Sequence, residues 1–196
     1  ENADIVISIL KTLNISKCHL VGWSMGSAVA LAVAKKEKTL IDKLVLITPF
    51  SWLGGAVYKD KTPFKLFISF IRIRERLFPN LNPQSKFSYL MKSSSINDEY
   101  SEWAWNNLHK SKDDFIYADG GRFVVPYDAR EWINQIENKC LVITGGKDRL
   151  VPEETSNEVV TRLKNVITKN FSDAGHSIPW THDKELLDEL SNFLEL

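Results

Sequence analysis

The sequence predicts an α/β protein built on a mostly parallel, doubly wound sheet, with a helical insertion between two of its strands. Short apolar runs rich in β-branched residues alternate with segments whose apolar residues recur at helical spacing. A Gly-x-Ser-x-Gly pentapeptide stands between one such run and a helix-forming run. The alternation breaks between Pro49 and Asn138. We therefore expect a sheet-forming core over residues 1–50 and 128–196 and a helical cap over residues 51–127.

Within the core, the chain is expected to alternate helices with strands. Apolar residues at helical spacing predict helices over residues 4–13, 24–36, 153–164 and 183–195. Continuous apolar runs predict buried parallel strands over residues 18–21, 44–48, 141–144 and 166–171. The first helix has its apolar residues at Ile5, Val6, Ile9, Leu10 and Leu13, and Asn14 is expected to stop it. The last helix is expected to carry one apolar stripe, made of Leu186, Leu187, Leu190, Phe193 and Leu194.

Composition excludes several classes of protein. The 196 residues carry 25 basic and 25 acidic side chains, so electrostatics favours neither nucleic acid nor an anionic membrane as a partner. Cys18 and Cys140 each begin an apolar run and are expected to be buried free thiols. The four histidines are scattered, so neither a metal site nor a cofactor is expected. No apolar run reaches the length of a membrane span, and a cytoplasmic location is expected.

The pentapeptide Gly22-Trp23-Ser24-Met25-Gly26 is typical of a nucleophile elbow, in which a serine sits on a sharp turn between a strand and a helix. The two glycines are expected to allow close approach of strand and helix. The alternative is an ordinary glycine-rich turn. A nucleophilic serine also needs a base and a group that orients the base, and both should follow later strands.

Asp148 and His176 meet this requirement, because each follows the end of an expected strand. Either residue alone is equally consistent with an ordinary loop position. Asp173 is a rival acid that more simply serves its own turn, and Asp119 and Asp128 are further rivals inside or beside the insertion.

The segments Val21–Ala28, Leu141–Asp148 and Asp173–Ser177 resemble the α/β-hydrolase fold family. The resemblance covers residues 1–50 and 128–196, and the insertion stands where that family places its cap. It implies a serine hydrolase in which Ser24 is the nucleophile, His176 the general base and Asp148 the orienting acid. The chain opens on the helix before the elbow strand, so the family's earlier strands are missing. We therefore expect a longer protein whose N-terminal remainder supplies one oxyanion-hole amide, with the Met25 amide as the other.

The expected reaction is two-step acyl transfer on an ester-like bond, a carboxylic ester or a thioester, of a small hydrophobic substrate. Because His176 must be neutral to act as a base, activity should fall below about pH 6.5. Trp23 and Trp52 are the expected substrate-binding or oxyanion-site residues beside Met25, although cap tryptophans also serve packing. Membrane contact by an apolar helix over residues 64–78 is possible but not favoured. The alternatives are a lyase, a C–C hydrolase, a perhydrolase, a slow-turnover ligand receptor, or an inactive fragment.

Overall fold

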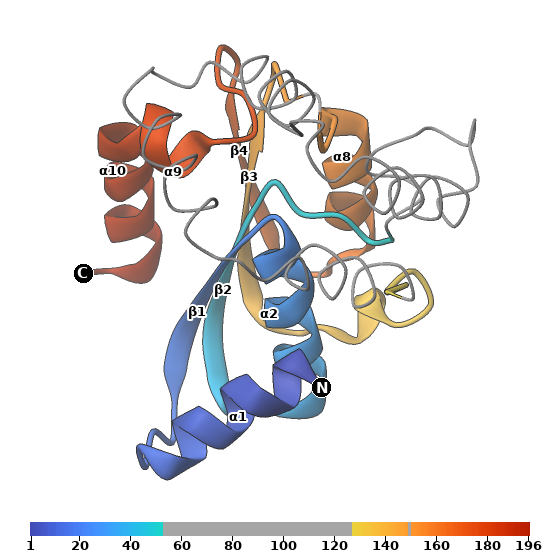
Figure 1. Ribbon diagram of the computed structural model, residues 1–196, viewed down its shortest axis with the longest axis vertical. Coiled ribbons are helices and arrows are strands. Elements are labelled where there is room, and N and C mark those ends of the chain that lie inside the picture. The colour runs from blue at the N-terminus through green and yellow to red at the C-terminus, as the bar shows by residue number, and fades with distance from the viewer. Residues whose placement is uncertain (53–126, 149) are drawn as a thin grey trace, which may run out of the picture.

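Four parallel strands form the sheet in the computed structural model, which describes residues 1–52, 127–148 and 150–196. The strands lie side by side in chain order, which is β1 (Cys18–Trp23), β2 (Ile41–Ile47), β3 (Lys139–Gly145) and β4 (Val166–Phe171) (Figure 1). The predicted parallel sheet is therefore confirmed. Because all four strands run in the same direction, their carboxyl ends meet at one edge, where ligands collect in sheets of this kind.

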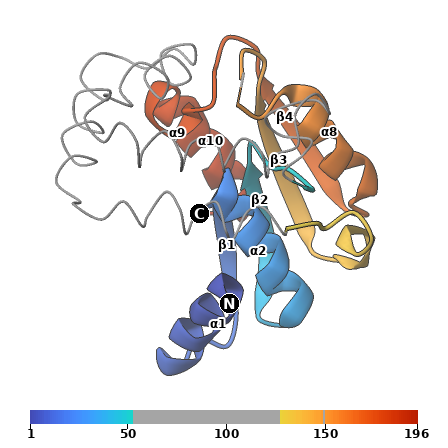
Figure 2. The same cartoon turned by 45° about the vertical axis from the view of Figure 1, so that its right-hand side comes forward.

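Helices cover both faces of the sheet, as a doubly wound fold requires (Figure 2). One face carries α2 (Met25–Lys36) and α8 (Glu153–Arg162), together with the short 3-10 helix η1 (Ile133–Gln135). The other face carries α9 (Ile178–Thr181) and α10 (Asp183–Leu194). The first helix, α1 (Asn2–Thr12), packs on α2.

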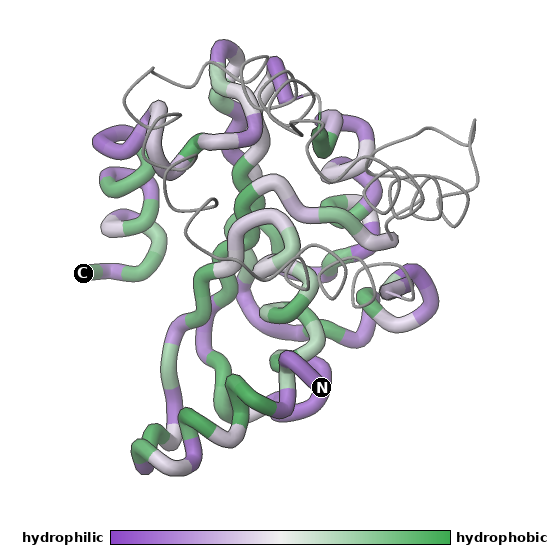
Figure 3. Tube along the Cα trace, viewed as in Figure 1, coloured by the Kyte–Doolittle hydropathy of each residue, from purple (hydrophilic) through white to green (hydrophobic). Residues whose placement is uncertain are grey.

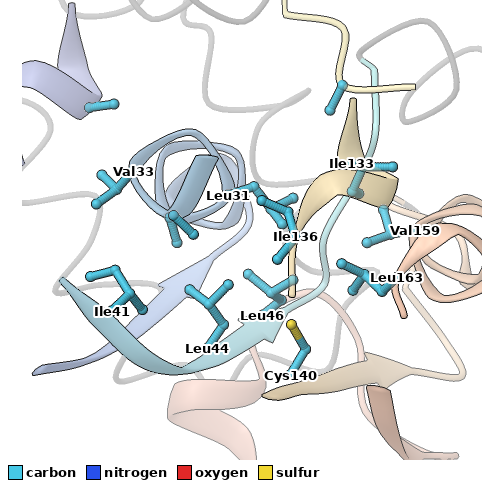
Figure 4. Packing of buried hydrophobic residues seen from close by; sticks show 14 of the residues in the cluster. Leu31, Val33, Ile41, Leu44, Leu46, Ile133, Ile136, Cys140, Val159 and Leu163 are labelled. Atoms are coloured by element: carbon cyan, nitrogen blue, oxygen red, sulfur yellow. The ribbon is translucent and has the colours of Figure 1, made fainter. Parts of the chain in front are cut away.

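The two middle strands have hydrophobic residues on both sides, which explains their unbroken apolar sequence. Leu44 and Leu46 of β2 point into the cluster beneath α2 and α8, while Val45 and Ile47 point into the cluster beneath α10. The first of these clusters is drawn in Figure 4. Its fully buried members at the centre include Leu31 of α2.

The elements match the predicted helices and strands, but the predicted apolar stripe of the last helix is wrong at one position. In α1 the buried residues are Ala3 and Ile7, whereas Ile5, Ile9 and Leu13 are 52–62% exposed. Ala3 and Ile7 join the cluster of α2, and Val6 and Leu10 pack against it, so the apolar residues of α1 lie on both its packed and its exposed sides. In α10 the predicted stripe loses Leu187, which is 60% exposed. Hydrophobic and hydrophilic residues alternate along both helices (Figure 3).

The expected stop at Asn14 is confirmed. Asn14 has a positive φ of 55°, and its amide donates to the Lys11 carbonyl at 3.0 Å. The amide of Ile15 donates to the Leu10 carbonyl at 2.9 Å. This pair of bonds satisfies the last carbonyls of α1 in the manner of a Schellman motif, with asparagine in the left-handed position.

The predicted cap over residues 51–127 lies outside the described residues except at its two ends. Those ends are joined by an isolated antiparallel bridge between Trp52 and Asp128. The Ala129 amide also donates to the Ser51 carbonyl at 2.7 Å. The two ends of the insertion are therefore held together above the sheet-forming core. No described helix combines the length and apolar composition that a membrane crossing requires.

Candidate active site

Ser24 occupies a strained turn at the carboxyl end of β1. Its φ of 53° and ψ of −118° lie in a region that residues with a side chain rarely adopt. Its amide donates to the Ile47 carbonyl of the neighbouring strand at 2.8 Å, which fixes the turn against β2. Met25 begins α2 directly afterwards, so the serine hydroxyl stands at the positive end of a 12-residue helix.

Gly22 allows this turn to form, whereas Gly26 shows no close packing against the described residues. A Cβ added at Gly22 would lie 2.4 Å from the carbonyl oxygen of Gly26 and 2.8 Å from the Cα of Ser27. A Cβ at Gly26 would meet no atom of the described residues within 4 Å. The buried Ser27 reinforces the elbow, because its hydroxyl lies 2.9 Å from the Gly22 carbonyl and 3.1 Å from that of Ile47.

His176 lies between Ser24 and Asp148 and contacts both. Its Nε2 is 2.9 Å from the Ser24 Oγ, and its Nδ1 is 2.8 Å from the Asp148 Oδ2. His176 is 3% exposed and Asp148 is 7% exposed. A neutral imidazole that carries its proton on Nδ1 donates to the carboxylate and leaves Nε2 free to accept the serine proton.

Asp148 is held rigidly by the turn that follows β3. Its Oδ1 accepts hydrogen bonds from the amides of Leu150 and Val151, both at 2.8 Å, while Oδ2 faces His176. Both carboxylate oxygens therefore accept hydrogen bonds, from two main-chain amides and from the imidazole. A carboxylate fixed in this way orients the imidazole and stabilises its protonated form.

Two glycines before Asp148 bring the β3 and β4 loops together, a role that was not predicted for them. A Cβ at Gly145 would lie 2.6 Å from the carbonyl oxygens of Ala174 and Gly175. A Cβ at Gly146 would lie 2.6 Å from the Ser172 carbonyl oxygen. The signal was present as a Gly-Gly pair between a strand and an acid.

The rival acids that the structure describes have other partners. Asp173 is exposed and lies 3.4 Å from the Nε2 of His182, and a hydrogen bond from its own amide lowers its pKa. Asp128 pairs with Arg130, whose hydrogen bonds lower the pKa of that carboxyl. Asp119 lies outside the described residues. His176 contacts Asp148 rather than either described rival.

The three expected binding residues lie in different settings. Met25 is 40% exposed. As the first residue of α2, it has an amide N–H with no hydrogen-bond acceptor inside the helix. Trp23 turns toward the loop of His176, to whose carbonyl its indole N–H donates at 2.9 Å. Trp52 packs against Arg130 at the base of the insertion, and the guanidinium carbon of Arg130 lies 4.2 Å from the centre of the Trp52 ring.

Two buried hydroxyls at the strand ends, Thr48 Oγ1 and Ser177 Oγ, have no hydrogen-bond partner among the described residues. Thr48 directly follows β2 and has a φ of 47°, which is unusual for a β-branched residue. Among the described residues, no cluster of His, Cys, Asp and Glu could hold a metal ion.

Comparisons with known proteins agree with the fold. A family model described as alpha/beta hydrolase fold matches residues 2–183. A 2-hydroxy-6-oxo-6-phenylhexa-2,4-dienoate hydrolase of Burkholderia cepacia is 27% identical over 198 residues, covering 97% of this chain and 68% of that protein. A meta-cleavage product hydrolase from Pseudomonas fluorescens IP01 superposes with a TM-score of 0.75 at 17% identity, covering 98% of this chain and 70% of its own. An esterase from Exiguobacterium antarcticum gives a TM-score of 0.79 at 16% identity, covering 99% and 72%.

Proposed function

Because the chain belongs to the alpha/beta hydrolase fold family, we propose that it is a serine hydrolase with Ser24 as nucleophile, His176 as general base and Asp148 as the residue that orients the base. The observation that supports this proposal most is the continuous pair of hydrogen bonds from Ser24 through His176 to Asp148, at 2.9 and 2.8 Å. The strained backbone of Ser24 adds to it, because such strain is concentrated at functional sites.

In the proposed reaction, Ser24 Oγ attacks a substrate carbonyl carbon while its proton moves to Nε2 of His176. The carbonyl oxygen, on which negative charge develops, accepts a hydrogen bond from the Met25 amide at the start of α2. The protonated His176 then gives its proton to the leaving group, and an acyl group remains on Ser24. Water deprotonated by His176 attacks this ester, releases the carboxylic acid and restores the serine.

The preferred substrate is a small hydrophobic carboxylic ester or thioester, for which an alcohol or thiol leaves directly. A second candidate is the cleavage of a carbon–carbon bond beside a ketone. The relatives favour it, because two of them are named as a hydroxy-oxo-phenylhexadienoate hydrolase and a meta-cleavage product hydrolase. A carbon leaving group departs only if it is protonated or its charge is delocalised, so this reaction needs a substrate with a conjugated dienol.

Labelling with a fluorophosphonate tests the nucleophile in the full-length protein. We expect the label on the Ser24 peptide, no label on Ser24→Ala, and unchanged labelling of Ser8→Ala, which removes an exposed hydroxyl from α1. We expect Ser24→Ala to lower kcat at least about a thousandfold. Label on another residue, or undiminished turnover in Ser24→Ala, would reject the assignment.

A paired substrate series then separates the two candidate reactions. p-Nitrophenyl esters of increasing acyl length report ester hydrolysis, and 2-hydroxy-6-oxohexadienoates report carbon–carbon cleavage by loss of the dienol absorbance. A higher kcat/KM for the esters supports the first candidate, and the reverse order supports the second.

Both cysteines are free thiols, which fits the cytoplasmic location that we also propose.

A further inference from the structure

Trp23 links the nucleophile turn to the loop that carries the base. It is the last residue of β1 and precedes Ser24 in the chain. Its indole Nε1–H donates to the backbone carbonyl of His176 at 2.9 Å, across 153 positions of sequence. The residue next to the nucleophile in the chain is therefore also hydrogen-bonded to the main chain of the base.

The indole ring makes two further contacts on the same side of the sheet. Its centre lies 5.4 Å from the centre of the His176 ring, with the planes tilted by 39°. The ring of Trp180 in α9 meets it edge-on at 4.6 Å. Trp23 is thus packed between the base and the helix that follows it, and it joins the cluster beneath α10.

These contacts complete the restraint on His176. Asp148 holds the imidazole through Nδ1, and this contact acts on the ring rather than on the main chain of His176. The indole fixes that main chain relative to Ser24, because Trp23 and Ser24 share one peptide unit. The Ser24 Oγ to His176 Nε2 distance of 2.9 Å is then set from both sides of the imidazole.

We propose that Trp23 is a positioning residue, whose indole N–H holds the His176 loop at a fixed position relative to the nucleophile turn. This inference rests on the proposed function of the triad. The one donor of the indole is used on the His176 carbonyl, so Trp23 offers the oxyanion no hydrogen bond, while substrate contact through its ring stays a prediction.

The test compares Trp23→Phe with Trp132→Phe in the full-length protein. Both changes keep an aromatic ring and remove one indole N–H that donates to a main-chain carbonyl at 2.9 Å, since Trp132 donates to Asp128. Trp132 packs on the opposite face of the sheet, in the cluster of α2 and α8. The control therefore loses the same kind of bond away from the triad.

We expect Trp23→Phe to lower kcat about threefold to tenfold, the range that one neutral hydrogen bond supports, with KM within about twofold. Fluorophosphonate labelling should slow by the same factor, and Trp132→Phe should change neither. Equal losses of kcat in both variants, or a raised KM with unchanged kcat in Trp23→Phe, would overturn the inference.

The proton NMR resonance of the His176 Nδ1–H gives a readout that does not need turnover. We expect Trp23→Phe to shift or broaden this resonance and Trp132→Phe to leave it in place. If the wild-type protein takes no label at Ser24, the proposed function fails. An unaltered resonance in Trp23→Phe overturns the positioning role, whatever the activity.

Discussion

Replacing Gly22 by alanine should be the most destructive one-carbon change at the elbow. The added Cβ would lie 2.4 Å from the carbonyl oxygen of Gly26, 2.6 Å from its carbonyl carbon and 2.8 Å from the Cα of Ser27. All three atoms belong to the main chain of α2, so no side chain can rotate away. The strand and the helix must separate by about 1 Å to restore ordinary contact distances near 3.5 Å.

The expected cost has two parts. Overpacking of a close contact costs about 1–3 kcal/mol in unfolding free energy. Separation also stretches the bond from the buried Ser27 hydroxyl to the Gly22 carbonyl, now 2.9 Å, and a buried group left without its partner costs about 1–3 kcal/mol more. Gly22→Ala should therefore lose about 2–6 kcal/mol.

Gly26→Ala is the matched control, because it adds the same carbon in the same turn at a position that has no close neighbour among the described residues. Its Cβ meets no described atom within 4 Å, and alanine in place of a helical glycine favours the folded state by about 0.5–1 kcal/mol. Urea unfolding followed by circular dichroism measures both variants. The reasoning fails if Gly22→Ala costs less than about 1 kcal/mol, or if Gly26→Ala costs as much as Gly22→Ala.

Three further changes test other parts of the site and core. Asp148→Asn should lower kcat about 10³–10⁴-fold, because an amide cannot stabilise the protonated imidazole, and less than a tenfold loss in steady-state assays would contradict this. Thr48→Gly should leave the unfolding free energy in urea unchanged or raise it by up to about 1 kcal/mol. The change relieves the φ of 47° and removes an unpaired hydroxyl, and these gains offset the lost packing. A drop above about 2 kcal/mol would contradict this. Burial raises the pKa of the Cys140 thiol from 9.0 to about 12, so the folded chain retains a proton that the unfolded chain releases. The thiol's contribution to the unfolding free energy is complete below about pH 9 and is lost as the pH rises toward 12, by up to about 1.4 kcal/mol per pH unit. Cys140→Ala should therefore reduce the fall in unfolding free energy over this pH range, measured by urea unfolding at successive pH values. An unchanged slope would contradict this.

Local patterns in the sequence were sufficient for the fold. The run at 44–48 starts three residues after the observed β2, Ile41–Ile47, and ends one residue after it, because a strand buried on both faces needs continuous apolar sequence. The positions of Asp148 and His176 just beyond strand ends were also readable, since parallel strands gather their carboxyl ends at one edge. The four-residue helix α9 and the 3-10 helix η1 escaped prediction because neither is long enough to show a period.

Long-range contacts account for what the sequence did not reveal. The bond from Trp23 to the His176 carbonyl joins residues 153 positions apart, and no spacing rule connects a tryptophan to a distant main-chain oxygen. The exposed side of α1 could not be predicted either, because it depends on where α2 lies. Within α1 the small Ala3 is buried while the larger Ile5 faces outward.

The pairing of β2 with β3 bears on how such a protein can diversify. Five consecutive residue pairs, from Lys43 with Lys139 to Ile47 with Ile143, keep an unbroken register although residues 48–138 separate the two strands. Lengthening a connection whose ends are already joined costs little, because each doubling adds only about 0.6 kcal/mol of chain entropy. Insertions between these strands can therefore vary in length and composition with little effect on the chemistry at the strand ends, which makes this segment a low-cost site for evolutionary change.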